Sequence, residues 1–469
     1  MKILFVVHGY PPTAMAGTEL CARRLCVALR DMGHAVSVFT REELLGWPEY
    51  KMLRGELDGI PVLRVVNNFT TLDTQGRYEH HPRIEEIFEE CLDREKPDLV
   101  HVQHLAGASW GIPGIAGRRG IPVVISLHDY WYACARVQLL RPDGSLCPGP
   151  DGGRNCARAC GRGTLASKAS AAAGRIKYAA GFTGSLPAER ACLAACGALQ
   201  RIFFRGRTRQ LERLYGERCA KLLGCLGEAD ALIAPSARAR EIYAAIGVPA
   251  ERILVIPHGA PPFPGLPAGS ALAPYDGTRP LVIGYAGTVM PHKGVITLLR
   301  AVRRFPPSRV RLAVYGRAYP ARFERFFNKV AGRFPAGQVT VRGMYRPEDL
   351  PAILAGVDLL AIPSLWHETF NLVLWEAWAA GLPVLASRVG ALADFVRDGV
   401  DGLVFPPGDW RALSAAIGAV IERPAVLGEL RKNLPRLCES IEENAWRYEE
   451  VYTRILAGRS GCGRGERAR

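Results

Sequence analysis

The chain has 469 residues, more than one ordinary domain of roughly 100 to 200 residues, so we expect two or three domains. Apolar residues make up 48% and charged residues 22%, a composition typical of a folded globular protein that excludes a largely disordered or collagen-like chain. The net charge of +15 indicates an anionic partner, which could be nucleic acid, an acidic membrane surface or a phosphorylated ligand.

The N-terminus carries only a short apolar run, Ile3 to Val7, which is too short for the core of a secretion signal. No stretch reaches the roughly 18 uninterrupted apolar residues of a spanning helix, so any membrane contact is expected to be peripheral. Thirteen cysteines without an export signal favour reduced thiols and a cytoplasmic location.

Short buried-strand patterns alternate with helical patterns along the first half of the chain. Strands are expected at 2–8, 35–40, 61–66, 99–102 and 123–127. This alternation is typical of a parallel sheet. A stretch rich in Pro and Gly between Pro257 and Pro280 then predicts an interdomain linker.

The same alternation restarts after the linker. Further strands are expected at 281–285, 310–315, 339–342, 359–363, 383–387 and 403–405. The predicted fold class is therefore α/β, with two Rossmann-like, doubly wound parallel-sheet domains. We place an N-terminal domain at 1–277, a C-terminal domain at 278–435, a helix crossing back to the first domain at 436–457, and a disordered tail at 458–469.

A loop rich in Gly and Pro at 134–160 departs from this scheme. It contains four cysteines, Cys134, Cys147, Cys156 and Cys160. Four thiolates could clamp the loop as a tetrahedral structural zinc site. Because the spacing is not the paired C-x-x-C pattern, reduced thiols without metal, or other metal or disulfide chemistry, remain alternatives.

A basic helical insertion is expected next, at 161–225. Residues 161–221 contain twelve Lys or Arg against three Glu, and the bases alternate with Ile, Phe and Leu at helical spacing. This pattern fits an amphipathic helix on anionic lipid. A solvated helical hairpin on the domain surface is the alternative.

The stretch "PSLWHETFNLVLWEAWAAGLPV" (363–384) places two glutamates after an expected strand, where open α/β sheets bind their ligands. We expect a helix from about Thr369, with Glu368 before it and Glu376 about two turns inside it. Eight residues at ~1.5 Å per residue cover about 12 Å, comparable with the distance from sugar to ribose in a nucleotide sugar. The first N–H groups of the helix, from Thr369, Phe370 and Asn371, would face a diphosphate. A half-exposed Glu376, or one paired with Arg, is the alternative.

Two more stretches follow expected strands. In "YAGTVMPHKGVITLLRAV", Lys293 sits at a helix start, where the macrodipole disfavours a cation unless a bound diphosphate reverses the local sign. In "HGYPPTAMAGTEL", Gly17 would let the backbone approach a ligand closely. The G-x-G-x-x-G fingerprint is absent there, so a dinucleotide redox cofactor is not expected. A solvated lysine and an ordinary loop glycine are the alternatives.

Histidines end two strands of the first domain. In "VVISLHDYW", His128 could donate to a sugar hydroxyl while Asp129 fixes its tautomer or orients the loop, although a structural histidine is an equal alternative. In "VHVQHL", His101 and His104 are expected to be structural or to line a pocket.

Together these motifs resemble the family 4 glycosyltransferases of the GT-B fold, over Met1 to about Leu456. The most specific feature is E-x7-E, here Glu368 to Glu376, supported by "GTVMPHKG", "VGALADFV", "DGLVFPPGD" and "GYPPTAMAGTE". The resemblance implies a retaining glycosyltransferase that takes a sugar from a nucleotide-diphosphate donor in a cleft between its two domains. It implies no metal for the chemistry, and a leaving phosphate that helps to deprotonate the acceptor.

The resemblance also implies site residues. Glu368 and His128 are the expected catalytic residues, with Glu368 on the donor sugar and His128 reaching that sugar from the opposite domain. Glu376 would hold the ribose, Lys293 the diphosphate, and Gly17 would approach the diphosphate or acceptor. The other expected donor-binding residues are Gly287, Thr288, Thr369, Phe370, Asn371, Leu372, Gly343 and Met344.

Three positions depart from the family pattern. Thr288 stands where many relatives have Arg, Asn371 where Gly is frequent, and Ala16 where a second loop Gly is frequent. They leave the choice of donor and acceptor open.

The insertion lies on the side where this family receives its acceptor. We therefore expect a glycan, lipid-linked or polysaccharide acceptor and contact with the cytoplasmic face of an anionic membrane. A non-catalytic sugar-nucleotide-binding scaffold is one alternative, although both glutamates and Lys293 argue against it. A basic nucleic-acid-binding protein is another, but the charge is concentrated in one insertion and no recognition motif accompanies it. An epimerase or phosphorylase of the same architecture would need a base or cofactor lysine that the sequence does not offer.

Overall fold

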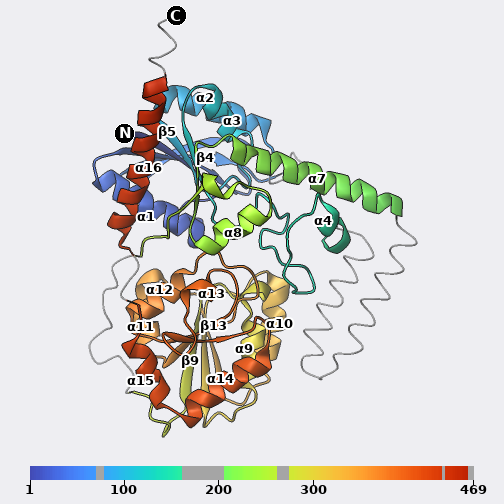
Figure 1. The fold of residues 1–469 in the computed structure, drawn as a ribbon, viewed down its shortest axis with the longest axis vertical. Helices are drawn as coiled ribbons and strands as arrows, with labels where there is room; N and C mark the ends of the chain where they lie inside the picture. The colour runs from blue at the N-terminus through green and yellow to red at the C-terminus, as the bar shows by residue number, and fades with distance from the viewer. Residues whose placement is uncertain (70–78, 161–204, 261–273, 436–438, 463–469) are drawn as a thin grey trace, which may run out of the picture. The chain divides into compact units, whose positions relative to one another are not determined.

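The computed structural model describes residues 1–69, 79–160, 205–260, 274–435 and 439–462 (Figure 1). The chain divides into two compact units, each with its own parallel sheet. The first unit comprises residues 1–137, 216–261 and 439–469, and the second comprises 138–215 and 262–438. The predicted α/β class with two parallel-sheet domains is confirmed.

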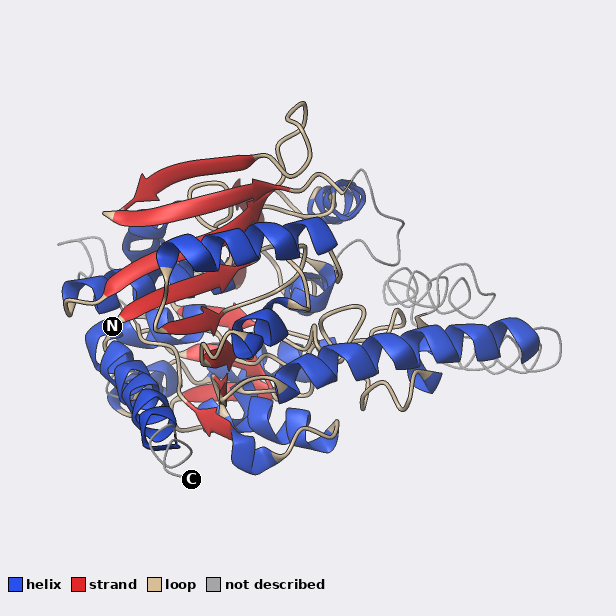
Figure 2. Cartoon of the chain, turned by 90° about the horizontal axis from the view of Figure 1, so that it is seen from above, coloured by secondary structure: helices blue, strands red, loops and turns tan. Residues whose placement is uncertain are grey.

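The first unit is built on an eight-stranded sheet of order β3-β4-β2-β1-β5-β6-β7-β8. Its strands are β1 (Lys2–Val7), β2 (Ala35–Glu42), β3 (Met52–Leu57), β4 (Ile60–Val66), β5 (Leu99–Val102), β6 (Val123–Ser126), β7 (Ala231–Ala234) and β8 (Ile253–Val255). Every neighbouring pair is parallel except β3–β4. Figure 2 shows helices on both sides of this sheet, as expected for strands that are apolar on both faces.

Helices connect these strands and cover the sheet. They are α1 (Gly17–Asp31), α2 (Pro82–Glu95), α3 (Ile112–Arg118), the C-terminal part of α7 (Arg205–Gly227), α8 (Ala237–Ala245) and α16 (Ile441–Cys462). On one face, Phe5 and Val7 of β1 share a core with residues of α1 and with Tyr448 and Tyr452 of α16. The C-terminal helix therefore completes the core of the first unit.

Three strands of this sheet were not expected from the sequence. The β3–β4 hairpin turns at Asp58 and Gly59, both with positive φ (53° and 70°). This Asp-Gly pair is a strong hairpin signal, which the sequence analysis missed because it relied on buried strand patterns. Strand β7 has four buried residues, all apolar, and is as long as β5 and β6, so it could have been expected from the same pattern, whereas β8 has only three residues.

The second unit has an all-parallel six-stranded sheet of order β11-β10-β9-β12-β13-β14. The strands are β9 (Leu281–Ala286), β10 (Val310–Tyr315), β11 (Val339–Gly343), β12 (Leu359–Ile362), β13 (Val384–Ser387) and β14 (Gly402–Phe405). The helices are α4 (Arg154–Ala159), α9 (Val295–Val302), α10 (Ala321–Ala331), α11 (Leu350–Ala355), α12 (Leu372–Ala379), α13 (Leu392–Phe395), α14 (Trp410–Glu422) and α15 (Ala425–Lys432). Both faces bury apolar side chains, with α9, α10, α14 and α15 on one and α11, α12 and α13 on the other.

Residues 138–215 group with the second unit, whereas the sequence analysis placed them in the N-terminal domain. No strand of either sheet lies in the described part of this segment. Its grouping is therefore set by loop and helix contacts, which strand patterns do not reveal. The region 161–204, which holds most of the predicted basic insertion, lies outside the described residues.

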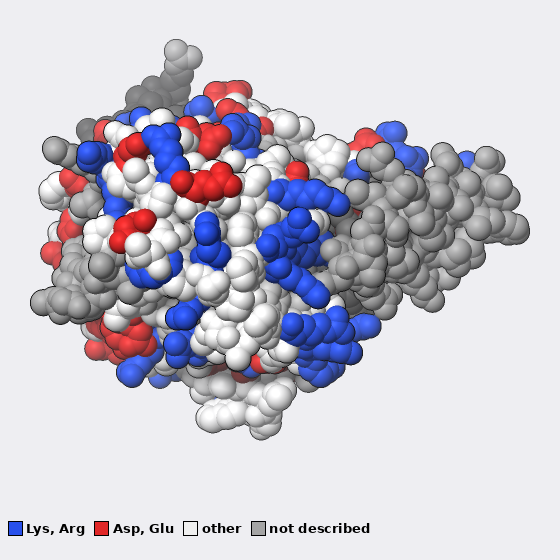
Figure 3. Space-filling model, turned by 90° about the horizontal axis from the view of Figure 1, so that it is seen from below, with Lys and Arg blue, Asp and Glu red and all other residues white. Residues whose placement is uncertain are grey.

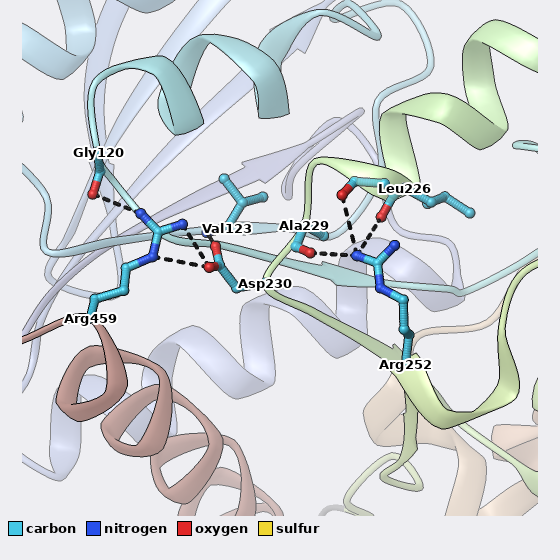
Figure 4. A network of polar contacts seen from close by, with 8 residues as sticks. Gly120, Val123, Leu226, Ala229, Asp230, Arg252 and Arg459 are labelled. Carbon is cyan, nitrogen blue, oxygen red and sulfur yellow. Dashed lines mark hydrogen bonds and ion pairs between the residues drawn. The ribbon is translucent and has the colours of Figure 1, made fainter. Parts of the chain in front are cut away.

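The chain's end also differs from the prediction of a disordered tail from residue 458. Helix α16 continues to Cys462, and Arg459 in its last turn pairs with Asp230 at 2.6 Å and donates to the carbonyl of Gly120 at 3.0 Å (Figure 4). These contacts tie the helix to the ends of β6 and β7 and explain its extra turn. Residues 463–469 lie outside the described part.

Helix α7 uses its C-terminal half for packing. Cys219, Leu222, Cys225 and Leu226 are buried, and Arg218 pairs with Glu79. This half of the predicted amphipathic helix is thus part of the first unit. None of the helices that the structure describes is both long and apolar enough to cross a membrane.

Candidate active site

Several loops meet at the carboxyl edge of the second sheet. Gly294, in the loop after β9, packs against the loop after β12 so closely that a Cβ at residue 294 would lie 1.7 Å from the Pro363 carbonyl oxygen. Its φ of +73° also favours glycine. Likewise a Cβ at Gly390, after β13, would lie 2.4 Å from the amide nitrogen of Glu368. The amide of Leu365 bonds the His292 carbonyl at 2.8 Å, and that of Ala391 bonds the Glu368 carbonyl at 2.8 Å. The loops after β9, β12 and β13 are therefore held in close contact around Glu368.

Glu368 and Lys293 form an ion pair at this edge. Lys293 Nζ lies 2.8 Å from Glu368 Oε1, and the Ser364 hydroxyl donates to the same oxygen. The Glu368 side chain is 2% exposed and that of Lys293 is 27% exposed. The ammonium also lies 5.2 Å from the centre of the Trp366 ring. A buried carboxylate needs such partners, and two further ammonium N–H donors remain for an anion.

Helix α12 begins later than predicted. Its first residue is Leu372, and Asn371 is the N-cap, with Oδ1 accepting from the amide of Leu374 at 3.0 Å. Glu376 is therefore only a little more than one turn into the helix, so the helical rise does not apply to the whole eight-residue spacing between it and Glu368. The helix N–H groups at the edge belong to Leu372 and Val373 rather than to Thr369, Phe370 and Asn371.

Glu376 is half-buried on α12. Burial, and then the charge of the Glu376 carboxylate, raise the pKa of Tyr345. Burial, and then the charges of Glu368 and Tyr345, raise the pKa of Tyr285. The buried Tyr285 and the partly buried Tyr345 are therefore each close enough to one of the two glutamates to feel its charge. The Tyr285 hydroxyl donates to the Thr288 carbonyl at 2.8 Å.

The other expected donor-side residues are spread over the same edge. Gly287, with φ of +130°, and Thr288 follow β9, and Gly343 ends β11 and accepts from the Gly316 amide at 2.6 Å. Met344 is 73% exposed. Phe370 is buried and stacks on Trp375 at 5.9 Å.

At the carboxyl edge of the first sheet, His128 belongs to a buried hydrogen-bond chain. His128 Nε2 lies 2.6 Å from Gln103 Oε1, and Gln103 Nε2 lies 2.9 Å from His101 Nε2. His101 Nδ1 lies 2.6 Å from the Tyr452 hydroxyl of α16. Burial lowers the pKa of His101 to about 3 and, with the neighbouring His258, lowers that of His128. Both rings are therefore neutral near pH 7.

Neutral rings make the donor and acceptor roles definite. The amide oxygen of Gln103 can only accept, so His128 Nε2 carries a proton and its Nδ1 carries the lone pair. The amide N–H donates to His101 Nε2, so His101 Nδ1 is protonated and donates to Tyr452. Gln103, which directly follows β5, thereby sets the tautomer of His128, a role the sequence analysis did not give it.

A second polar cluster at this edge was also missed. His8 Nε2, just after β1, lies 3.2 Å from Glu19 Oε1 in the first turn of α1, and the His8 ring packs 4.3 Å from that of His104. His104 in turn lies 3.3 Å from Asp129. Within the described residues, His8 Nδ1 and Glu19 Oε2 are buried without a hydrogen-bond partner. His8 directly follows β1, so its place after a strand, like that of His128, is the sequence signal for this cluster.

Gly17 is the first residue of α1 and is exposed, with Ala16 as an N-cap that makes no side-chain bond. It belongs to the first unit, as does His128, whereas Lys293, Glu368 and Glu376 belong to the second. The structure thus places the donor-side residues in one unit, where Lys293 and Glu368 are in contact, and the histidines in the other.

The four cysteines proposed for zinc are all described. Cys134 belongs to the first unit and Cys147, Cys156 and Cys160 to the second. Within the described residues, no three His, Cys, Asp or Glu side chains are arranged to hold a metal ion. The zinc site gains no support from this arrangement and stays a prediction.

Comparison with known proteins places the chain in a family. The model described as "Glycosyl transferases group 1" matches residues 280–423, and that described as "Glycosyl transferase 4-like domain" matches residues 16–173. The D-inositol 3-phosphate glycosyltransferase of Nocardia farcinica is 32% identical over 207 residues, 42% of this chain and 46% of that protein. The MMP alpha-(1->4)-mannosyltransferase of Mycolicibacterium hassiacum is 30% identical over 242 residues, 49% of this chain and 56% of that protein. The chain spans about half the length of these curated relatives.

Solved structures resemble the whole chain. Sucrose-phosphate synthase from Thermosynechococcus elongatus has a TM-score of 0.65 at 20% identity, covering 97% of this chain and 99% of that one. HepE of Anabaena, in complex with UDP and glucose, has a TM-score of 0.60 at 17% identity, with the same coverage. These identities bear on the fold alone. With both family models matched along a chain of two parallel-sheet units, the protein belongs to the group 1 glycosyltransferases of family 4 and has the GT-B fold.

Proposed function

We propose that the protein is a retaining glycosyltransferase that transfers a sugar from a nucleotide-diphosphate donor to a glycan, lipid-linked or polysaccharide acceptor. The observation that carries this proposal is the Lys293–Glu368 pair beside the N-terminus of α12, at the carboxyl edge of the second sheet. A cation, helix N–H groups and a buried carboxylate are what a sugar diphosphate requires.

The donor would be held by complementary groups. Lys293 and the amides of Leu372 and Val373 would bind the diphosphate, and Glu368 would accept hydrogen bonds from the donor sugar. Glu376, half-buried on the same helix, would accept from the ribose hydroxyls. The relatives named as glycosyltransferases, and a similar structure solved with UDP, are consistent with a nucleotide-sugar donor.

In the reaction, the acceptor hydroxyl oxygen would form a bond to the anomeric carbon as the bond from that carbon to the phosphate oxygen breaks. The hydroxyl proton would pass to the leaving diphosphate on the same face, which gives retention. Lys293 would stabilise the charge that grows on the diphosphate, and His128 would bind a sugar hydroxyl. This chemistry uses no metal.

We further propose a cytoplasmic protein that binds peripherally to the cytoplasmic face of an anionic membrane. The excess of Lys and Arg in residues 161–221 supports this.

A structural zinc bound by the cysteines of the 134–160 loop is proposed separately, and metal analysis of purified protein with a four-cysteine variant as control tests it. Absence of stoichiometric metal would remove that site.

Thermal-shift measurements with uridine, guanosine, adenosine and thymidine diphosphates test the donor site, because a ligand that binds the native state raises its melting temperature. We expect one base to give a selective shift, and Glu376→Ala to abolish it. An unchanged shift in Glu376→Ala would refute the ribose assignment. Binding without hydrolysis or transfer of the matching nucleotide sugar would instead favour the non-catalytic scaffold.

A further inference from the structure

A second basic region lies in the nucleotide-binding unit, far in sequence from the insertion. Residues 309–342, which form β10, α10 and β11, contain seven Arg and one Lys against one Glu. At the opposite end of the same sheet, residues 402–432 contain four basic and three acidic residues. The sequence analysis held that the positive charge is concentrated in one insertion, and this second basic region contradicts that statement. We call residues 309–342 the basic edge.

The basic edge is a surface rather than a scattered set. Strand β11 is the edge strand of the sheet, β10 is its neighbour, and α10 connects the two. On α10, Phe327 and Val330 are buried against the core, whereas Arg322, Arg325 and Lys329 are exposed. Spacings of three and four residues put these three cations on one side of the helix.

The remaining cations of the basic edge are exposed as well, namely Arg309, Arg311, Arg317, Arg333 and Arg342. Within the described residues, none of the eight forms an ion pair. Figure 3 shows Lys and Arg gathered on the side where Figure 1 draws α9 and α10, with most visible Asp and Glu on the other side. By contrast, Arg423 at the opposite end of the sheet pairs with Glu429 at 2.6 Å. Uncompensated charge of this kind favours an anionic partner.

Exposed apolar side chains accompany these cations. The large hydrophobic residues that are exposed in the described part of the second unit are Tyr319 (57%), Val341 (43%) and Met344 (73%). Tyr319 lies between Arg317 and α10, and Val341 directly precedes Arg342. All three therefore lie within or beside the basic edge.

We propose that the basic edge binds the headgroup region of an anionic phospholipid bilayer. Arg is planar and pairs with phosphate through two hydrogen bonds, and seven of the eight cations are Arg. Exposed apolar side chains among cations suit a membrane interface, where they enter the boundary of the acyl chains. A nucleic acid would use the same cations and would have no use for an exposed Val341.

This inference deepens the proposed membrane association. It rests on that proposal only because a bilayer is chosen as the anionic partner. It adds a second contact, on the unit that holds Lys293 and Glu368. A lipid-linked acceptor would then be met by the donor-binding unit as well as by the insertion.

Flotation of the full-length protein with vesicles tests the proposal. The vesicles are phosphatidylcholine alone and phosphatidylcholine mixed with phosphatidylglycerol, at low salt and at ~0.15 M salt. The test variant is Arg322→Glu, Arg325→Glu and Lys329→Glu together. The matched control is Arg411→Glu, Arg423→Glu and Lys432→Glu, which changes the charge equally at the opposite end of the sheet.

We expect the parent and the control to float with the anionic vesicles only, and the test variant to bind them more than about tenfold more weakly. Equal binding by test variant and parent would overturn the proposal and leave the insertion as the membrane contact. The proposal would also be overturned, in favour of nucleic acid, if the parent does not bind vesicles but binds an oligonucleotide that the test variant does not bind. The nucleotide thermal shift, measured on the same samples, reports separately whether the variant is folded and whether the proposed donor site exists.

Discussion

The carboxyl edges of the two sheets are polar in different ways. In the second unit, the polar groups are charged, with Lys293 paired to a Glu368 carboxylate that is 2% exposed. In the first unit, the central groups are neutral, because burial lowers the pKa values of His101 and His128. The Lys293–Glu368 pair is suited to a diphosphate, whereas neutral histidines with fixed tautomers are suited to hydroxyl groups. The same fold thus offers two kinds of recognition.

Removing the carboxylate of Glu368 should have the largest effect. Glu368→Ala is expected to lower kcat by about a thousandfold, because a buried group aimed at the reacting sugar acts mainly in the transition state. Nucleotide diphosphate affinity should change little, and steady-state kinetics together with thermal shifts measure both. A variant that keeps its kcat would show that Glu368 does not contact the reacting sugar.

Removing the cation should weaken binding instead. Lys293→Met is expected to reduce nucleotide diphosphate affinity by about 10- to 100-fold, because a charged hydrogen bond is lost. The melting temperature without ligand should also fall, since Glu368 is left buried without its cation. Calorimetric titration and thermal unfolding measure the two effects, and Lys293→Arg is the charge-conserving control. Unchanged affinity would assign the diphosphate to other groups.

In the first unit, Gln103 is expected to act as a positioning residue for His128. Gln103→Leu should reduce kcat/KM roughly tenfold, because His128 loses the partner that fixes its tautomer. Gln103→Glu keeps the acceptor oxygen but adds a negative charge, which should raise the pKa of His128 and move the acid limb of the pH–rate profile upward. If Gln103→Glu and Gln103→Leu have the same profile, Gln103 is only a packing residue.

The last prediction concerns stability against pH. Burial lowers the pKa of His258, which stacks on His128 at 5.0 Å, to about 4, from an ordinary value of 6.5. Between those values the unfolded chain binds the proton and the folded chain does not, so stability is fully present above pH 6.5 and declines as the pH falls towards 4. Melting temperatures over this range should show the decline, and a smaller decline in His258→Asn. Equal slopes for parent and variant would contradict the assignment.

Much of the fold could be predicted because both sheets are built from apolar runs that differ clearly from their connections. Strand β3 was missed because its pattern is largely exposed, and β8 because it has only three residues, whereas β7 carries the same four-residue buried pattern as β5 and β6 and could have been predicted. The site is a different matter. Motif and spacing placed Lys293 and Glu368 after strands, but their contact depends on loop packing at Gly294 and Gly390, which no periodicity encodes.

The sequence analysis predicted the wrong start for α12. Asn371 was taken as a donor of its N–H, yet its side chain caps the helix, which moves the helix start by three residues. Gln103 and Glu19 were missed for a related reason. Each acts through a histidine, and only the folded chain shows that the two side chains are in contact.

The crossing of α16 over the first unit has a consequence for how the protein is made. Tyr448 and Tyr452 fill the core beside α1, and Tyr452 also ends the hydrogen-bond chain that begins at His128. A ribosome-bound chain that has just released residue 277 carries all eight strands of the first sheet but neither tyrosine. The half that is synthesised first therefore waits for the last helix to leave the exit tunnel, and protein cut short before residue 441 should be a poor source of folded material.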